Sequence, residues 1–316
     1  MKLRIALTAA LALTAAGCAT RQPSEIERIM AEADKLPDTP GTGLYPALTE
    51  LDPELEGYVV YRPQDLAPFA GGKLGLFVWG NGACAADGTS VRQHLAEIAS
   101  HGYLVIAPGG WKSGPNAREP RDPPRAPGGP FETPTTATDL AHALDWAIAE
   151  HGRTGSRYLG LIDPAAIALG GFSCGGIQAL RLADDPRIDT LVVQNSGILI
   201  DQPPGGAAGE MSMSKDQLKA IHTPVLYLLG GPTDIAYANG MDDFARLAHV
   251  PAMMVNLPVG HGGTYHEPNG GKAAAIVVDW LEWHLRGDAE SRAAFACPEG
   301  RWCRDSQVTL ERKNGL

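Results

Sequence analysis

The chain has 316 residues, of which 44% are hydrophobic and 20% are charged, and its formal net charge is −10. These values are typical of a globular protein and exclude a mainly disordered chain. The acidic balance argues against nucleic acid as a partner, because phosphate binding needs a basic surface.

Residues 1–17 are predicted to be a signal peptide. Lys2 and Arg4 precede an apolar run at residues 5–16, which as a helix would measure roughly 18 Å. That is well short of a bilayer core of about 30 Å, and it fits the apolar region of a secretory signal.

The residues that follow, Ala15-Ala16-Gly17-Cys18, resemble the lipobox of bacterial lipoproteins, with Ala15 in place of the usual leucine. The resemblance implies cleavage before Cys18, acylation of its thiol by palmitate and related chains, and anchoring to a membrane. An ordinary secretory signal cut near Ala16 is the alternative. The expected location is the cell envelope, at the outer membrane or in the periplasm if the host has two membranes. Disulfides are permitted there.

Residues 18–56 are predicted to be a lipid-anchored tether that contains one short helix. Ser24 and Glu27 form a capping box at its start. Four apolar residues then share one helix face: Ile26, Ile29, Met30 and Ala33. Glycine and proline in residues 37–43 end the helix. It either docks on the domain or spaces the domain from the membrane.

From residue 57 onward, strand-like apolar runs alternate with helical ones. Strands are predicted at residues 58–61, 74–79, 103–107, 167–170, 191–194, 225–229 and 252–257. Helices are predicted at residues 91–100, 138–150, 175–183, 241–248 and 272–285. This alternation predicts an α/β domain over residues 57–316, with a mostly parallel central sheet and helices on both faces.

Gly171-Phe172-Ser173-Cys174-Gly175 is a G-x-S-x-G motif between a predicted strand and a predicted helix. Glycines on either side permit a tight strand-to-helix turn that exposes the serine hydroxyl at the edge of the sheet. The motif therefore predicts Ser173 as a nucleophile, with the backbone N–H of Cys174 aimed at developing negative charge. A chance match in a glycine-rich chain is the alternative.

Histidine is suited to remove a serine proton at neutral pH. His261 lies in a glycine-flanked loop directly after the last predicted strand, with His266 as a nearby rival. Asp234 follows the strand at residues 225–229 and would orient the imidazole, with Asp201 as the alternative acid. A plain turn residue is the other interpretation of Asp234.

The G-x-S-x-G motif, Asp234 and His261, in that order on an alternating chain, resemble the α/β-hydrolase family over residues 57–286. Within it, residues 99–103 and 144–146 are similar to the dienelactone-hydrolase and polyester-hydrolase branch, which includes cutinase-type poly(ethylene terephthalate) hydrolases. The resemblance implies an α/β-hydrolase fold and the hydrolysis of carboxylic esters.

Trp79-Gly80-Asn81-Gly82 stands where many members of that family have His-Gly at the oxyanion loop. The resemblance implies that the backbone N–H of Asn81, or that of Gly82, is a second oxyanion donor beside Cys174. Trp79 departs from the usual histidine.

Residues 108–134 follow a strand and contain eight prolines and five glycines, with Trp111 near the start. Loops of this length are usually functional or disordered. One interpretation makes the loop a wall of the substrate cleft, with Trp111 binding substrate. The other makes it a surface excursion.

Four cysteines remain besides Cys18. Cys297 and Cys303 are six residues apart and could pair locally, which would pin a C-terminal tail. Cys84 lies in the loop that the resemblance assigns to the oxyanion hole, and Cys174 follows the nucleophile. If both segments build one oxyanion hole, their backbones approach within the range of a disulfide, so a Cys84–Cys174 bond is predicted. Two buried free thiols are the alternative.

The sequence therefore predicts a serine ester hydrolase that acts on a small-molecule or polymeric ester and needs no cofactor. No metal is expected, because the spacing of His261, His266 and Glu267 matches no helical zinc motif. Two alternatives stay open at this point: a binding lipoprotein without turnover on a hydrolase scaffold, and an amide or peptide hydrolase.

Overall fold

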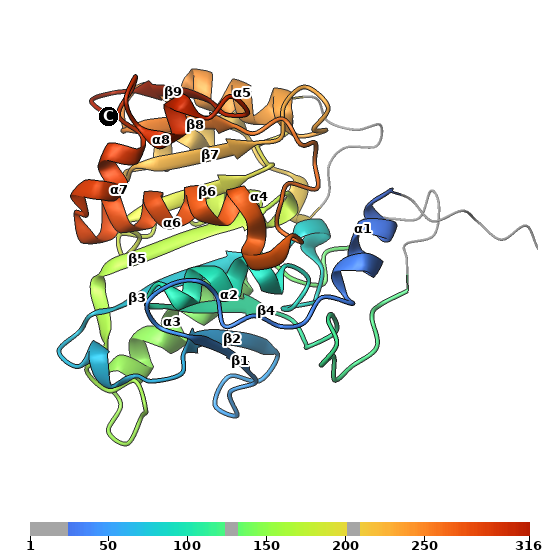
Figure 1. Cartoon of the computed structure of the whole chain (residues 1–316), viewed down its shortest axis with the longest axis vertical. Coiled ribbons are helices and arrows are strands. Elements are labelled where there is room, and N and C mark those ends of the chain that lie inside the picture. The colour runs from blue at the N-terminus through green and yellow to red at the C-terminus, as the bar shows by residue number, and fades with distance from the viewer. Residues whose placement is uncertain (1–24, 124–131, 201–208) are drawn as a thin grey trace, which may run out of the picture.

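A nine-stranded sheet forms the centre of the computed structural model, which describes residues 25–123, 132–200 and 209–316 (Figure 1). The strand order is β1-β2-β4-β3-β5-β6-β7-β8-β9. Strands β4, β3 and β5 to β8 run parallel to one another, whereas β2 pairs antiparallel with β1 and β4, and β9 pairs antiparallel with β8. The expected α/β architecture with a mostly parallel sheet is confirmed. The predicted signal peptide, Cys18 and Asp201 lie outside the described residues.

Seven strands lie where the apolar runs predict them, and two edge strands, β1 and β9, were not expected. The strands are β1 (Ala47–Glu50), β2 (Tyr58–Pro63), β3 (Leu74–Gly80), β4 (Tyr103–Pro108), β5 (Ile162–Phe172), β6 (Thr190–Gln194), β7 (Val225–Leu229), β8 (Ala252–Asn256) and β9 (Thr309–Lys313). The inner strands carry almost continuous apolar runs because helices cover both of their faces.

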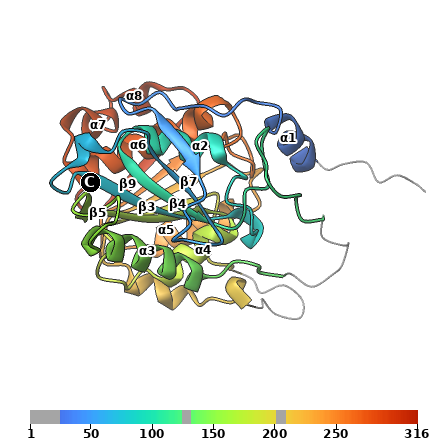
Figure 2. The same cartoon turned by 90° about the horizontal axis from the view of Figure 1, so that it is seen from below.

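Helices pack on the two faces of the sheet, as Figure 2 shows, with α3, α4 and α5 on one face and α2 and α6 on the other. The helices are α1 (Glu25–Ala33), α2 (Arg92–Ser100), α3 (Ala137–Gly152), α4 (Cys174–Arg181), α5 (Tyr237–Arg246), α6 (Gly271–Arg286), α7 (Ala289–Ala294) and α8 (Arg301–Arg304). None of the helices in the described ranges is both long enough and apolar enough to cross a membrane.

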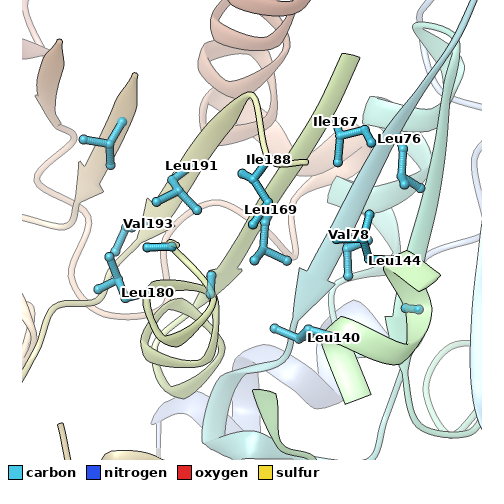
Figure 3. Packing of buried hydrophobic residues seen from close by; sticks show 14 of the residues in the cluster. Leu76, Val78, Leu140, Leu144, Ile167, Leu169, Leu180, Ile188, Leu191 and Val193 are labelled. Atoms are coloured by element: carbon cyan, nitrogen blue, oxygen red, sulfur yellow. The ribbon is translucent and has the colours of Figure 1, made fainter. Parts of the chain in front are cut away.

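Successive side chains of one strand enter two different hydrophobic clusters, because they point to opposite faces of the sheet. In β3, Leu76 and Val78 pack under α3 and α4, whereas Phe77 and Trp79 pack under α2 and α6. Figure 3 shows part of the cluster under α3 and α4, with these residues labelled: Leu76, Val78, Leu140, Leu144, Ile167, Leu169, Leu180, Ile188, Leu191 and Val193. Packing of the helices on both faces holds the parallel strands side by side. The loops that follow their carboxyl ends therefore lie next to one another.

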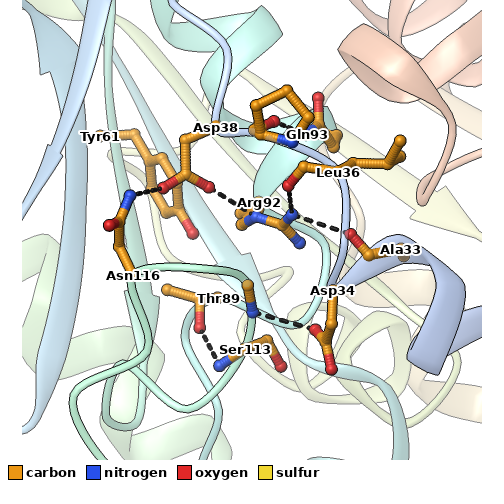
Figure 4. Close-up of polar contacts among 12 residues, drawn as sticks. Ala33, Asp34, Leu36, Asp38, Tyr61, Thr89, Arg92, Gln93, Ser113 and Asn116 are labelled. Atoms are coloured by element: carbon orange, nitrogen blue, oxygen red, sulfur yellow. Dashed lines mark hydrogen bonds and ion pairs between the residues drawn. The ribbon is translucent and has the colours of Figure 1, made fainter.

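The expectation of a tether up to residue 56 is wrong for its second half. Residues 47–50 form β1, which extends the sheet by pairing with β2. Helix α1 also docks, because the buried guanidinium of Arg92 donates to the carbonyls of Ala33 and Leu36 and to Asp38 (Figure 4). The segment after α1 is therefore part of the domain rather than a free spacer.

The C-terminal residues are likewise more than a tail. Helices α7 and α8 follow α6, and β9 then adds an antiparallel edge strand to β8, with Thr309 opposite Asn256. The sequence of β9 is mostly polar, and its side chains are largely exposed. A strand of this kind carries no apolar periodicity, which is why the sequence did not predict it.

Candidate active site

Ser173 stands at the sharp turn between β5 and α4 with a φ of 54° and a ψ of −117°. This backbone conformation is costly for a residue with a side chain, and it projects the hydroxyl away from the strand. Gly175 makes the turn feasible, because a Cβ there would collide with the carbonyl oxygen of Gly80. The glycine of the motif is thus needed where α4 approaches β3.

The structure brings together the three residues predicted as a triad. His261 lies on the loop after β8, and its Nε2 is 3.1 Å from Ser173 Oγ. Its Nδ1 is 2.6 Å from Oδ1 of Asp234, which lies on the loop after β7. Ser173, His261 and Asp234 follow three parallel strands whose carboxyl ends meet at one edge of the sheet. A proton can therefore pass from the hydroxyl to an imidazole that a carboxylate orients.

Asp234 is buried, with 4% of its surface exposed, and it accepts four hydrogen bonds. Oδ1 accepts from His261 and from the N–H of Ala236 at 2.9 Å, and Oδ2 accepts from the N–H of Gly230 at 3.1 Å and from Asn195 Nδ2 at 2.9 Å. Burial alone would raise the pKa of Asp234, but the hydrogen bonds from His261 and from the N–H groups of Ala236 and Gly230 outweigh it and hold the pKa below its ordinary value. Asp234 is therefore ionised at neutral pH.

His266, the rival base, lines a hollow that it shares with residues of α1. Burial, together with the nearby cations Arg121 and Arg92, lowers its pKa to about 4. Among the described contacts, the histidine bonded to Ser173 Oγ is His261.

The two segments predicted to form an oxyanion hole are covalently joined. Cys84 and Cys174 form a disulfide with their Cα atoms 5.3 Å apart, and Cys297 and Cys303 form a second one at 5.4 Å. Both predicted pairings are confirmed. Cys174 is the first residue of α4, so its N–H has no acceptor inside the helix.

A buried asparagine side chain, that of Asn81, holds the loop after β3 in place. Asn81 is fully buried, and its amide Nδ2 donates to the carbonyl of Ala85 at 2.9 Å and to that of Pro108 at 2.7 Å. Its backbone nitrogen lies against the start of α4, because a Cβ on Gly175 would come within 2.7 Å of it. The oxyanion roles of Asn81, or Gly82, and of Cys174 stay predictions, but their segments are adjacent.

A small hollow of about 80 Å³ opens beside Ser173 and His261. Five apolar side chains contribute to its wall: Ile177, Leu199, Met211, Ile235 and Ala236. Two polar side chains in the wall already have partners, since Ser196 Oγ donates to the carbonyl of Ser173 at 2.6 Å and Asn239 Oδ1 accepts from the N–H of Ile200 at 3.0 Å. The hollow therefore suits a small uncharged group.

Trp111 does not line this hollow. Its ring is 6% exposed and packs in the cluster under α2 and α6, with the guanidinium of Arg118 4.8 Å from the ring centre. In the described part of the 108–134 loop, the indole of Trp111 is therefore part of the hydrophobic core. The predicted contact between Trp111 and substrate is not supported. Residues 124–131 of that loop lie outside the described residues.

Sequence reasoning missed Asn195, Tyr265 and Phe172. The Phe172 ring packs 5.1 Å from the His261 ring and 5.0 Å from the Tyr265 ring. Phe172 is the first of the two variable residues of the G-x-S-x-G motif, so only its position next to Ser173 could have pointed to it. Asn195 directly follows β6, and a polar residue at the carboxyl end of a parallel strand was the signal available for it.

Within the described residues, no group of three or more His, Cys, Asp or Glu side chains is arranged to hold a metal ion. Comparison of the sequence with models of known protein families and with curated proteins finds no match.

Proposed function

We propose that this chain is a serine hydrolase of carboxylic esters with an α/β-hydrolase fold, related to the dienelactone-hydrolase and polyester-hydrolase branch. One observation carries the proposal: Ser173 Oγ, the His261 ring and the Asp234 carboxylate form an unbroken hydrogen-bonded chain that starts at a strained turn. The strained backbone of Ser173 lowers the free energy of unfolding, and residues with such strain cluster at functional sites.

In the proposed reaction, Ser173 Oγ bonds to the ester carbonyl carbon while His261 Nε2 takes the hydroxyl proton. The carbonyl oxygen becomes an oxyanion held by the N–H of Cys174 and that of Asn81 or Gly82, each worth a few kcal/mol of barrier. The bond to the alkoxy oxygen then breaks, and His261 gives its proton to the departing alcohol. Asp234 stabilises the imidazolium between these two steps.

Water completes the cycle. His261 takes a proton from water as the water oxygen bonds to the acyl carbon, and it returns the proton to Ser173 Oγ when the acyl–serine bond breaks. The hollow beside Ser173 is small and apolar, so we propose esters with a short, uncharged acyl or alcohol group, either free or within a polymer. An anchor at Cys18 would place this activity in the cell envelope.

The test uses the chain from residue 19 onward, without the signal peptide and the anchor, and p-nitrophenyl acetate, butyrate and octanoate. The acetate and butyrate are expected to be turned over fastest. Ser173→Ala should fall to the background rate. The matched control is Ser306→Ala, which changes an exposed serine in the same way and should keep the wild-type rate.

A fluorophosphonate probe separates catalysis from mere binding. The probe forms a bond from Ser173 Oγ to phosphorus as fluoride leaves, so the intact chain should be labelled at Ser173 and the Ser173→Ala chain should not. An unlabelled wild-type chain would support the binding alternative, and faster cleavage of a matched amide than of the ester would support the peptidase alternative. Turnover that survives in Ser173→Ala would overturn the mechanism.

A further inference from the structure

One buried amide connects the loops that carry Asp234 and His261. Asn195 directly follows β6, has 1% of its surface exposed and adopts a φ of 43°, which asparagine tolerates better than most residues. Its Nδ2 donates to Asp234 Oδ2 at 2.9 Å and to the carbonyl of Gly260 at 3.1 Å. Gly260 immediately precedes His261. A single nitrogen, Asn195 Nδ2, therefore connects the segments that follow β6, β7 and β8.

A second buried residue determines which way this amide points. The hydroxyl of Tyr265 donates to Asn195 Oδ1. Tyr265 is completely buried, and burial raises its pKa far above its ordinary value, so it keeps its proton. With the amide oxygen facing this donor, the amide NH₂ faces Asp234. A flipped amide would instead place its oxygen against the carboxylate, which repels it.

The ring of Tyr265 is itself held by packing. Its centre is 5.2 Å from the ring of His94 and 5.0 Å from that of Phe172, and Phe172 also contacts His261. The loops that carry Asp234 and His261 are also linked directly, because the N–H of Gly260 donates to the carbonyl of Gly230 at 2.8 Å.

We propose that Asn195, oriented by the hydroxyl of Tyr265, is a positioning residue that holds Asp234 and the His261 loop in the geometry needed for proton transfer. The inference rests on the proposed ester hydrolysis. Asn195 and Tyr265 act through Asp234 and the backbone before His261, because neither lines the hollow beside Ser173. Without the amide, the described partners of Asp234 Oδ2 are reduced to the N–H of Gly230.

The test compares Asn195→Ala and Tyr265→Phe with wild type. Small misplacements of catalytic groups can cost about 100-fold in rate, so kcat should fall up to about 100-fold in Asn195→Ala and by a smaller factor in Tyr265→Phe. KM should stay within a factor of about two, because the hollow is intact. Tyr61→Phe is the matched control, since Tyr61 is equally buried and its hydroxyl donates to the carbonyl of Gly88 at 2.8 Å.

Asn195→Asp adds a pH signature that a merely structural role would not produce. The new carboxylate would face Asp234 Oδ2, and the two acids can bridge only while they share a proton. The ratio of kcat/KM for Asn195→Asp to that of wild type should therefore fall as pH rises. The same ratio for Asn195→Ala should stay flat, because no new titrating group is present.

A measurement without substrate separates this inference from the proposed function. In proton NMR of the full domain, the His261 Nδ1–H bonded to Asp234 should give a downfield resonance that shifts or broadens in Asn195→Ala and Tyr265→Phe but not in Tyr61→Phe. If wild type neither hydrolyses esters nor reacts with the fluorophosphonate, the proposed function fails and this resonance alone decides the positioning role. Wild-type kcat and an unchanged resonance in both variants would overturn it.

Discussion

Cys84 and Cys174 tie the loop after β3 to the residue that follows Ser173, with their Cα atoms 5.3 Å apart. They are 90 residues apart in the sequence, but β3 and β5 are neighbours in the sheet, so the segments at their carboxyl ends are adjacent. The disulfide therefore joins the two backbone segments that the proposed oxyanion hole needs.

Removing this bond in Cys84→Ala/Cys174→Ala should lower both stability and activity. A closed span of this length contributes up to about 4–5 kcal/mol by chain entropy, and the loss should appear as a lower urea midpoint. The value of kcat should fall because the two segments are then free to move apart.

The second disulfide is the control for that pair. Cys297→Ala/Cys303→Ala opens a span of only six residues, so its effect on stability should be about 2 kcal/mol. The value of kcat should be unchanged, because neither cysteine lines the hollow beside Ser173. Equal losses of kcat in the two double variants would contradict the assigned role of Cys84–Cys174.

Relieving the backbone strain at Ser173 should stabilise the fold. Glycine adopts a positive φ without the steric cost that a Cβ incurs, so Ser173→Gly should be more stable than Ser173→Ala by about 1 kcal/mol. Both variants lack the hydroxyl, which removes its hydrogen bond to His261 from the comparison. Chemical unfolding of the two proteins side by side measures the difference, and equal midpoints would mean that the turn holds no strain.

Loss of the Arg92 side chain should release the segment around α1. The guanidinium is 5% exposed and bonds to Asp38 and to two carbonyls, which Arg92→Ala would leave without this donor. Losing these hydrogen bonds takes the donor away from two carbonyls and from the partly exposed Asp38 carboxylate, at a cost of about 1–3 kcal/mol. Limited proteolysis should then cut near residues 34–40 faster than in wild type. Arg153→Ala, which removes a partly exposed arginine paired to Glu150, should leave the digestion pattern unchanged.

Acid should weaken the fold through three histidines that stay neutral, the fully buried His94 and the partly buried His266 and His284. Burial lowers the pKa of His284 to about 4, that of His266 to about 4 and that of His94 to about 3. Their ordinary value of 6.5 applies in the unfolded chain, which binds more protons below that pH. Their contribution to stability is therefore complete above pH 6.5 and is lost as the pH falls toward 4.

His284→Phe tests this with the ring packing retained, since the His284 ring lies 4.0 Å from the Trp280 ring and 4.4 Å from the Trp283 ring. Between pH 7 and pH 5, wild type should lose on the order of 2 kcal/mol more unfolding free energy than the variant does. Parallel stability curves for the two proteins would contradict the role of this histidine.

Much of the fold could be predicted from the sequence because its signals are local. Apolar runs mark the inner strands, and helical spacing marks α2, α3 and α6, since these elements bury a face whatever their neighbours are. Strand β9 escaped prediction because it is polar, largely exposed and held in the sheet by backbone pairing with β8. Trp111 illustrates the same limit: an aromatic residue in a long loop gives no local sign of whether it faces the core or a cleft.

By itself, the sequence determined the alternation of strands and helices, the glycine-flanked serine turn and the order in which serine, aspartate and histidine follow their strands. These features depend on a few neighbouring residues and on the common direction of parallel strands. Only the tertiary structure decided that Asn195 bridges Asp234 and Gly260, and that Tyr265 orients it across 70 residues of sequence. Such contacts depend on which strands become neighbours in the sheet, and that outcome follows from packing of the whole core rather than from any local pattern.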